Sequence, residues 1–257
     1  MNDVFSALPG EIYRLIAGSP AQIDDIGRSC AKVLMSEEMC LKIAPQGSLR
    51  RAAVMQEYFH KKGLSAPLVK YVQSNGQDFL LMRRVSGSYA CDSRLMSDPV
   101  NLARRIGEAV RMLHETDASD CPLKDANRIA YDAMCAELSG VEALNCPMPE
   151  RFRILKNDAL IHGDCCLPNI FFEGDRFCGF VDLGESGLGD RHFDLYWAAW
   201  SLGYNLGTDQ YRDDFLDAYG RDAIDIERAK LCAYIANPKG SLRLAAWRKM
   251  GAVSEAD

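Results

Sequence analysis

Four polar side chains in the second half of the chain have types and spacings that suit phosphoryl transfer. His162, Asp164 and Asn169 follow the pattern H-x-D-x-x-x-x-N, and Asp182 comes later in the triplet Asp-Leu-Gly. In such a set one carboxylate accepts the proton of a hydroxyl, while an amide oxygen and a second carboxylate hold Mg²⁺ against nucleotide phosphates. Because few residues separate Asp164 from Asn169, we expect both side chains to face one pocket.

Asp182 reaches the same pocket only if the chain after Asn169 folds back on itself. Residues 177–183 (FCGFVDL) are apolar enough for a strand that delivers Asp182 at its end, so a hairpin is predicted here. The alternative is that Asp164 and Asn169 form turns and Asp182 caps a helix. The occurrence of all three with apolar strands between them favours the site. His162 is expected to support the loop through hydrogen bonds rather than to act as the base.

The elements that must position these residues differ between the two halves of the chain. Before residue 84 the pattern is typical of strands with one helix: strands are expected at 31–35, 39–43, 67–72 and 79–82, and a helix from 50 to about 62. From residue 98 the pattern becomes helical. Asp98 and Pro99 form an N-cap and a first helical position, and helices are predicted over 100–114, 193–204 and 211–219.

These patterns predict an α+β fold with two lobes. Residues 1–84 would form a small lobe with an antiparallel sheet, and residues 85–257 a larger helical lobe that carries the catalytic loop and the acceptor site. Small molecules usually bind at such a junction. The candidate site is therefore expected between the lobes.

Composition and charge exclude several classes of protein. Thirty Lys and Arg against 36 Asp and Glu give a net charge of −6, so we expect no nucleic-acid partner. The sequence lacks the roughly 18-residue apolar run of a membrane helix, and its beginning does not resemble a secretory signal. The ten cysteines contain no Cys-x-x-Cys pair and are interpreted as reduced core residues. We expect a cytoplasmic protein with no membrane partner.

Residues 162–200, HGDCCLPNIFFEGDRFCGFVDLGESGLGDRHFDLYWAAW, resemble the catalytic core of the aminoglycoside phosphotransferase family. The 3′-phosphotransferase branch is the most similar, and the likeness extends from about residue 15 to about residue 235. It implies the two-lobed fold of protein kinases and a nucleoside triphosphate, ATP or GTP, as phosphoryl donor. It also implies Asp164 as the catalytic base and Asn169 and Asp182 as Mg²⁺ ligands.

The same resemblance suggests which residues bind the nucleotide. Lys42, in an apolar strand, would contact the α- and β-phosphates, and Ser29 would lie in the loop over the β-phosphate. The backbone of Arg83 and Val85, in the linker between the lobes, would hydrogen-bond the adenine. Met82 would line the adenine pocket, or else belong to the ordinary core.

One family residue is missing. A helix glutamate that pairs with the strand lysine falls on Ala52 in this chain, and Glu57 lies on another face of the same helix. Either the helix is shifted or Lys42 is held in another way. A kinase-like nucleotide-binding protein with little catalysis is therefore an alternative to an enzyme.

The acceptor is expected to be a small, cationic, hydroxylated molecule, with aminoglycosides implied by the resemblance. Acidic residues crowd 209–227 and would attract a cation, although a solvated acidic face explains them as well. Trp200 and Tyr204 occupy positions where the family carries charged contacts to the drug, and aromatic rings stack on flat or sugar faces. Residues 236–257 do not match the family's acidic ending. Another hydroxylated metabolite or antibiotic therefore stays an alternative acceptor.

Overall fold

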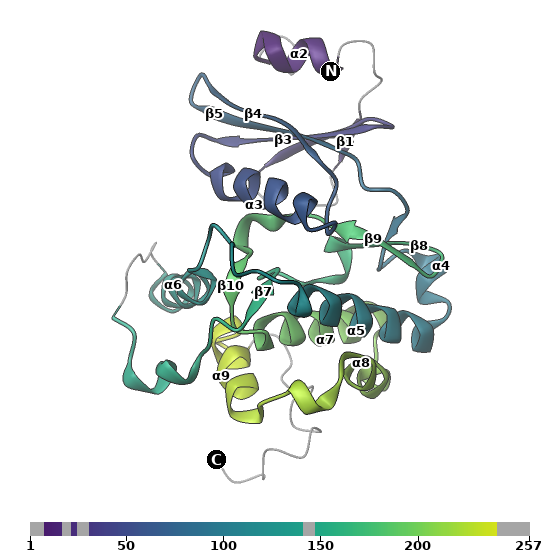
Figure 1. Cartoon of the computed structure of the whole chain (residues 1–257), viewed down its shortest axis with the longest axis vertical. Helices are drawn as coiled ribbons and strands as arrows, with labels where there is room; N and C mark the ends of the chain where they lie inside the picture. Colours follow the sequence, from purple (N-terminus) through teal and green to yellow (C-terminus); the bar gives the residue numbers. More distant parts are fainter. Residues whose placement is uncertain (1–7, 17–21, 25–30, 141–146, 241–257) are drawn as a thin grey trace.

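The computed structural model describes residues 8–16, 22–24, 31–140 and 147–240 of the chain. An antiparallel sheet with one helix beneath it lies above a mainly helical region (Figure 1). This arrangement confirms the predicted α+β fold. The division at residue 84 stays a prediction, and the last strand of the upper sheet ends beside it, at Arg83.

The upper sheet has the strand order β1-β2-β3-β5-β4, and all neighbours are antiparallel. Its strands are β1 (Gln22–Asp24), β2 (Lys32–Met35), β3 (Met39–Pro45), β4 (Leu68–Ser74) and β5 (Gln77–Arg83). The turn between β4 and β5 places Asn75 and Gly76 at φ 51° and 73°. Asn and Gly tolerate this left-handed conformation, which explains the tight hairpin. The sequence pattern predicted four of these strands with ends shifted by at most a few residues.

Alternation along the strands gives the two faces of the sheet different partners. Leu41, Ile43, Phe79 and Leu81 pack against α2 (Gly10–Ile16) on one face. Leu80 and Met82 pack against α3 (Arg50–Lys61) on the other face. Lys42 lies between Leu41 and Ile43 and pairs with Leu80 across the ladder, so its side chain belongs to the α3 face. That face is the one turned toward the helical region (Figure 1).

The helical region is built around α5 and α7, which contribute many of its fully buried side chains. Asp98 caps α5 by accepting a hydrogen bond from the Asn101 amide. The helices are α4 (Ser93–Met96), α5 (Pro99–Glu115), α6 (Ala126–Ser139), α7 (His192–Leu206), α8 (Arg212–Tyr219) and α9 (Ile226–Ala236). Short 3-10 turns are η1 (Glu150–Ile154), η2 (Leu167–Asn169), η3 (Leu183–Glu185) and η4 (Arg221–Ala223).

Two small sheets lie between the upper sheet and these helices. One pairs β7 (Ala159–Ile161) with β10 (Gly187–Gly189), and the other has the order β6-β8-β9. The strands of the second are β6 (Ser88–Tyr89), β8 (Ile170–Glu173) and β9 (Arg176–Phe180). The hairpin of β8 and β9 is the one predicted between Asn169 and Asp182. The candidate catalytic residues Asp164, Asn169 and Asp182 lie in the connections at the ends of these strands.

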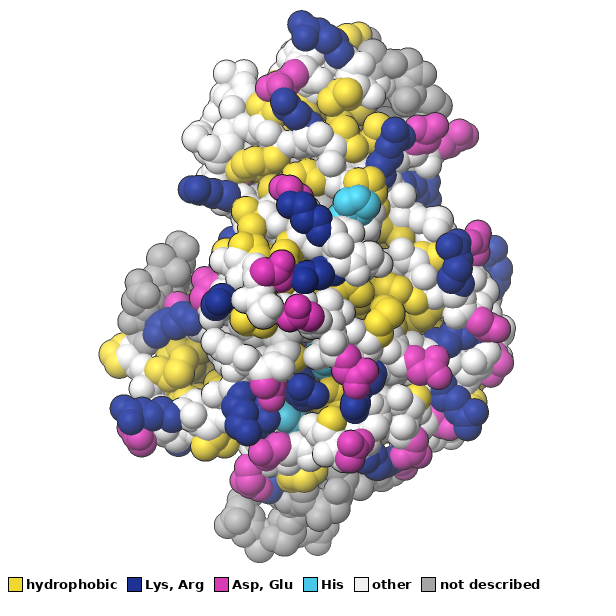
Figure 2. All heavy atoms as spheres, viewed as in Figure 1, with side chains coloured by type: hydrophobic (Ala, Val, Ile, Leu, Met, Phe, Trp, Pro, Cys, Tyr) yellow, Lys and Arg dark blue, Asp and Glu magenta, His cyan; other side chains and the backbone are white. Residues whose placement is uncertain are grey.

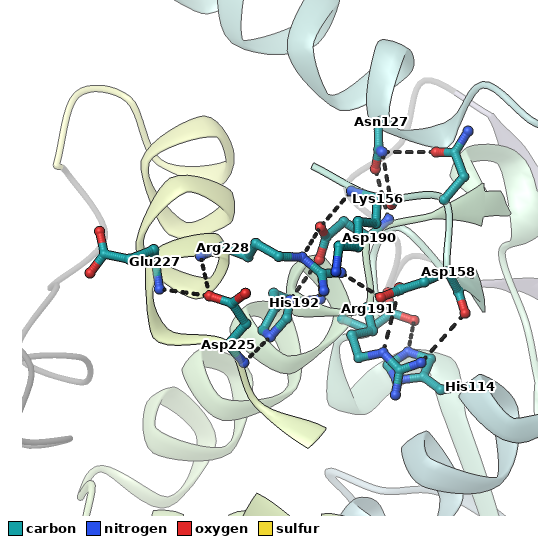
Figure 3. Close-up of polar contacts among 12 residues, drawn as sticks. His114, Asn127, Lys156, Asp158, Asp190, Arg191, His192, Asp225, Glu227 and Arg228 are labelled. Atoms are coloured by element: carbon teal, nitrogen blue, oxygen red, sulfur yellow. Dashed lines mark hydrogen bonds and ion pairs between the residues drawn. The ribbon is translucent and has the colours of Figure 1, made fainter. Parts of the chain in front are cut away.

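A buried ion pair ties α9 to the start of α7 (Figure 3). Arg228 Nε donates to Asp190 Oδ2 over 2.8 Å, and a second nitrogen donates to Asp158 Oδ2 over 2.6 Å. His192 Nδ1 lies 2.6 Å from the other oxygen of Asp190. Burial works to raise the pKa of Asp190, but the hydrogen bonds from His192 and Arg228 outweigh it and lower the pKa well below its usual range. Asp190 is therefore a permanent anion inside the protein.

Replacing Arg228 with methionine is expected to lower the free energy of unfolding by about 3 kcal/mol, because the buried Asp190 carboxylate loses its cationic partner. Arg221 provides a control, since its ion pairs with Asp213 and Asp217 are exposed. Arg221→Met should cost no more than about 1 kcal/mol. Urea unfolding followed by circular dichroism measures both losses. Equal losses for the two variants would contradict a stabilising role for the buried pair.

Surface charge is mixed. Figure 2 shows basic and acidic side chains interspersed over the visible face. Part of the acidic charge of residues 209–227 is paired locally: Asp209 pairs with Arg212, and Arg221 holds both Asp213 and Asp217. This pattern favours a solvated face over a field aimed at a cationic acceptor. Within the described residues, no helix combines the length and the apolar character needed to cross a bilayer.

Candidate active site

The loop after β7 carries Asp164, and a buried carboxylate on α7 fixes its backbone. Asp194 accepts hydrogen bonds from the amides of His162, at 2.7 Å, and Gly163, at 2.9 Å. His114 Nε2 lies 3.1 Å from the same carboxylate, and both side chains are fully buried. The backbone just before Asp164 is therefore held from inside the helical region.

His162 supports the same loop, as predicted. Its Nε2 lies 2.8 Å from the Val181 carbonyl, and its Nδ1 lies 3.3 Å from the Asp164 amide. A carbonyl can only accept and an amide can only donate, so the ring is neutral with its hydrogen on Nε2. Because both nitrogens are occupied and the residue is buried, His162 has no free lone pair for an acceptor hydroxyl.

Gly163 brings the loop against the segment that follows Asp182. It has φ +87°, and a Cβ at this position would lie 2.6 Å from the Glu185 carbonyl oxygen. Only glycine combines this conformation with so close an approach. Gly163 therefore makes Glu185 a direct neighbour of the loop that carries Asp164.

The hairpin of β8 and β9 brings Asn169 and Asp182 together. Val181 donates its amide to the Asn169 carbonyl at 3.0 Å, which places Asp182 one residue from that contact. Asn169 Nδ2 donates to the backbone oxygen of Asp164 at 2.9 Å and to its Oδ2 at 3.1 Å. The side-chain nitrogen of Asn169 thus faces Asp164. The side-chain oxygen of Asn169 can therefore accept other partners.

Asp182 is paired with Lys42 rather than used as a helix cap. It has left-handed backbone angles, φ 63° and ψ 59°, and its side chain makes no cap hydrogen bond. Lys42 Nζ lies 2.8 Å from Asp182 Oδ1, although 139 residues lie between the two in the sequence. Desolvation by the surrounding protein works to raise the pKa of Asp182, but the charge and the hydrogen bond of Lys42 outweigh it and lower the pKa. Asp182 is therefore ionised, and non-glycine residues with such angles are typical of functional sites.

The pairing resolves the question of what holds Lys42. Ala52 is buried and packs with Ala53, Leu80 and Met82, so α3 is seated on the sheet by small apolar side chains. Glu57 pairs with Lys61 on the exposed surface of α3. Among the described residues, the only ion pair of Lys42 is with Asp182.

The residues predicted to bind the adenine ring already make other contacts within the protein. Met82 is 5% exposed and belongs to the core between the upper sheet and α3, so the packing favours the core alternative. The Arg83 amide donates to the Pro67 carbonyl at 3.0 Å, and the backbone contact of Arg83 with adenine stays a prediction. Val85 is buried and its Cγ1 lies beside Gly179 of β9. Ser29 lies outside the described residues.

A third carboxylate near the site was not predicted to have a role. Burial, followed by repulsion from Asp164 and Asp182, raises the pKa of Glu185 to about 7, and Arg51 acts in the opposite direction. Glu185 is nevertheless classed among the solvent-exposed residues by its accessible surface. The sequence signal was its place in Asp-Leu-Gly-Glu, three residues after Asp182.

An aromatic stripe follows one side of α7. The rings of Trp197 and Trp200 meet edge to face at 5.8 Å, and those of Trp200 and Tyr204 stack at 5.2 Å. Ser201 lies on the same helix, one residue after Trp200, and its Oγ accepts a hydrogen bond from the Leu167 amide in the catalytic loop. The stripe therefore lies along the helix that contacts the loop carrying Asp164.

Comparison with known proteins identifies the family. A model of the phosphotransferase enzyme family matches residues 35–232, which include Lys42, Asp164, Asn169 and Asp182. This chain belongs to the phosphotransferase enzyme family. A probable aminoglycoside 3′-phosphotransferase from Lactococcus lactis subsp. lactis is 40% identical over 207 residues, which cover 74% of this chain and 79% of the relative.

Solved structures agree on the fold. A type VIII aminoglycoside-3′-phosphotransferase superposes with a TM-score of 0.65 at 21% identity, over 91% of this phosphotransferase and 97% of the other chain. An aminoglycoside phosphotransferase from Streptomyces rimosus, in complex with ADP and streptomycin, gives a TM-score of 0.64 at 20% identity, over 87% and 94% of the two chains. The kinase-like fold implied by the sequence is confirmed.

Proposed function

We propose that this phosphotransferase uses a nucleoside triphosphate, ATP or GTP, to phosphorylate a hydroxyl of an aminoglycoside. The proposal rests on the contacts that bring Asp164, Asn169 and Asp182 close to Lys42 of the upper sheet. The names of the relatives support an aminoglycoside as acceptor and a nucleotide as donor.

Asp164 is the proposed catalytic base. Its carboxylate would accept the proton of the acceptor hydroxyl as the hydroxyl oxygen bonds to the γ-phosphorus and the bond to the β-phosphate oxygen breaks. The hydrogen bond from Asn169 Nδ2 holds Asp164 Oδ2, and Asp194 holds the backbone before it. These contacts fix the base before substrate arrives, which lowers the cost of reaching the reactive geometry.

The donor set fits Mg²⁺ bound together with phosphates. Asp182 and Asn169 offer oxygen ligands, and Mg²⁺ in nucleotide sites takes one or two protein carboxylates with its other ligands from phosphate and water. When bound, the ion neutralises charge on the transferring phosphoryl group. No cluster of three His, Cys, Asp or Glu side chains suited to a metal occurs in the described part of the chain. The site therefore suits a metal–nucleotide complex better than the stand-alone metal of a hydrolase.

Lys42 is the proposed contact for the α- and β-phosphates. Its ammonium lies 2.8 Å from Asp182 Oδ1, on the side of the sheet that faces the catalytic loop. The pair keeps a cation and an anion in place for the phosphates and the metal. The stripe of Trp197, Trp200 and Tyr204 is proposed to lie under a sugar ring of the acceptor.

Purified protein with Mg-ATP or Mg-GTP should transfer one phosphoryl group to kanamycin or neomycin. Mass spectrometry detects the product, and phosphorus NMR identifies the hydroxyl that is modified. Streptomycin is an aminoglycoside with a different core, and transfer to it would also support the proposal. Choline serves as an acceptor from another class. Transfer to choline alone would favour a metabolite kinase. Nucleotide binding with no transfer to any acceptor would favour a kinase-like binding protein and reject the proposal.

A further inference from the structure

One arginine connects α3 to the segment that follows Asp182. Arg51 Nε donates to the Gly184 carbonyl, and a terminal nitrogen donates to the Ser186 carbonyl, both at 3.2 Å. The other terminal nitrogen lies 2.9 Å from each carboxylate oxygen of Asp125, just before α6. The guanidinium of Arg51, in the first turn of α3, thus forms hydrogen bonds with three separate groups of the chain below the upper sheet.

The two carbonyls flank Glu185 in the turn that leads away from Asp182. Ser186 Oγ donates to the Leu183 carbonyl at 2.7 Å, so the turn also has an internal hydrogen bond. The Glu185 backbone is in contact with Gly163, the residue before Asp164. The segment held by Arg51 therefore lies between the two proposed functional carboxylates, attached to Asp182 through the chain and to Asp164 through packing.

Among the residues that the structure describes, no other side chain of α3 forms a hydrogen bond with residues 183–186. Ala52 is apolar and packed on the sheet, and Glu57 pairs with Lys61 on the surface. Lys42, on the strand β3 against which α3 packs, pairs with Asp182 and not with α3. Arg51 is therefore the side chain that ties α3 to the catalytic backbone by hydrogen bonds, in addition to the apolar packing of Phe59 against Phe180.

We propose that Arg51 is a positioning residue for phosphoryl transfer, which sets the place of Asp182 and Asp164 by clamping the turn between them to α3. This inference rests on the roles proposed above for the two carboxylates. The planar guanidinium presents five donors in a fixed fork and can satisfy three acceptors at once. A lysine in the same place keeps the charge but cannot reproduce the geometry.

Arg51→Met and Arg51→Lys are compared with Arg50→Met in a kinetic test. Arg50 is exposed at the start of the same helix and makes no hydrogen bond or ion pair among the residues that the structure describes. With ATP and the best aminoglycoside acceptor, we expect Arg51→Met to lower kcat by about 10- to 100-fold, because a misplaced catalytic group costs rate at that scale. The Mg²⁺ concentration for half-maximal velocity should rise, while KM for the acceptor stays within about threefold. Arg51→Lys should recover only part of kcat.

Asp125→Asn keeps both carbonyl contacts of Arg51 and should lower kcat far less than Arg51→Met does. Asp125→Asn also provides a second variant if Arg51→Met folds poorly. Thermal melting of every variant corrects kcat for the folded fraction. The inference is overturned if Arg51→Met matches Arg50→Met, or if its whole loss disappears after that correction. Lack of transfer by the unmodified protein would instead reject the proposed function, so the two failures are distinguishable.

Discussion

Asp164→Asn is expected to lower kcat for phosphoryl transfer by about 10²- to 10⁴-fold, the range associated with loss of a general base. Asparagine has nearly the same shape as aspartate, and its oxygen can still accept the hydrogen bond from Asn169 Nδ2. It cannot take a proton from the acceptor hydroxyl. The dissociation constants for Mg-nucleotide and acceptor should therefore change little, and the loss should lie in kcat.

Initial rates at saturating substrates measure the loss, and calorimetric titration with a non-hydrolysable nucleotide measures the binding. Asp213→Asn is a suitable control, because Asp213 is exposed on α8 and pairs with Arg221. The control should keep kcat within about twofold of the unmodified protein. An Asp164→Asn variant as active as the control would show that another group takes the proton. Glu185 would then be the first residue to test, since it lies against the same loop.

Local patterns were sufficient for much of the fold. Short apolar runs predicted β3 and β5, and the structure joins β4 to β5 through a tight turn at Asn75 and Gly76. The spacing of Asp164, Asn169 and Asp182 predicted a loop followed by a returning strand, which the pairing of β8 with β9 provides. These features depend on residues close in the sequence, where side-chain periodicity and turn chemistry act directly.

Contacts between distant segments could not be derived in the same way. The ion pair of Lys42 and Asp182 depends on how the upper sheet sits over the loop, and no local pattern encodes that placement. The same holds for Arg51, which the sequence presents as one more charged residue at the start of a helix. Asp194 is an ordinary acidic residue in the sequence, yet its buried carboxylate fixes the backbone of the catalytic loop. Burial and partner together define these roles.

An apolar run also leaves open which element packs against each face of a strand. The pattern of β5 places Met82 on a face but does not say what covers that face, and the structure covers it with α3. The acidic stretch 209–227 shows the same limit for charge. Its composition suggests a negative field, but pairing of Asp213 and Asp217 with one arginine removes part of that field. An inference from charge is therefore weaker than one from a spaced set of functional residues.

Lys42→Ala is expected to lower kcat/KM for ATP by about 10- to 100-fold, through the loss of charge-assisted hydrogen bonds to the phosphates. Asp182 would lose its only ion-pair partner among the described residues and would bind the metal–nucleotide complex without the opposing cation. The matched control is Lys70→Ala. Lys70 lies on β4 of the same sheet, and it pairs with Glu11 of α2 on the opposite face.

Nucleotide affinity and initial rates should both distinguish the Lys42→Ala variant from the Lys70→Ala variant. Lys42→Ala should weaken binding of Mg-ATP and also lower the rate, whereas Lys70→Ala should leave both within about twofold of the unmodified protein. Asp182→Asn should instead raise the Mg²⁺ requirement strongly, because an amide is a poorer ligand than a carboxylate for this ion. If Lys42→Ala left nucleotide affinity and rate unchanged, the pair would be only a link between the sheet and the loop. Suppose instead that the rate falls only in Lys42→Ala and Asp182→Asn, the first with weaker nucleotide binding and the second with a higher Mg²⁺ requirement. Lys42 would then act on the nucleotide phosphates and Asp182 on the metal ion.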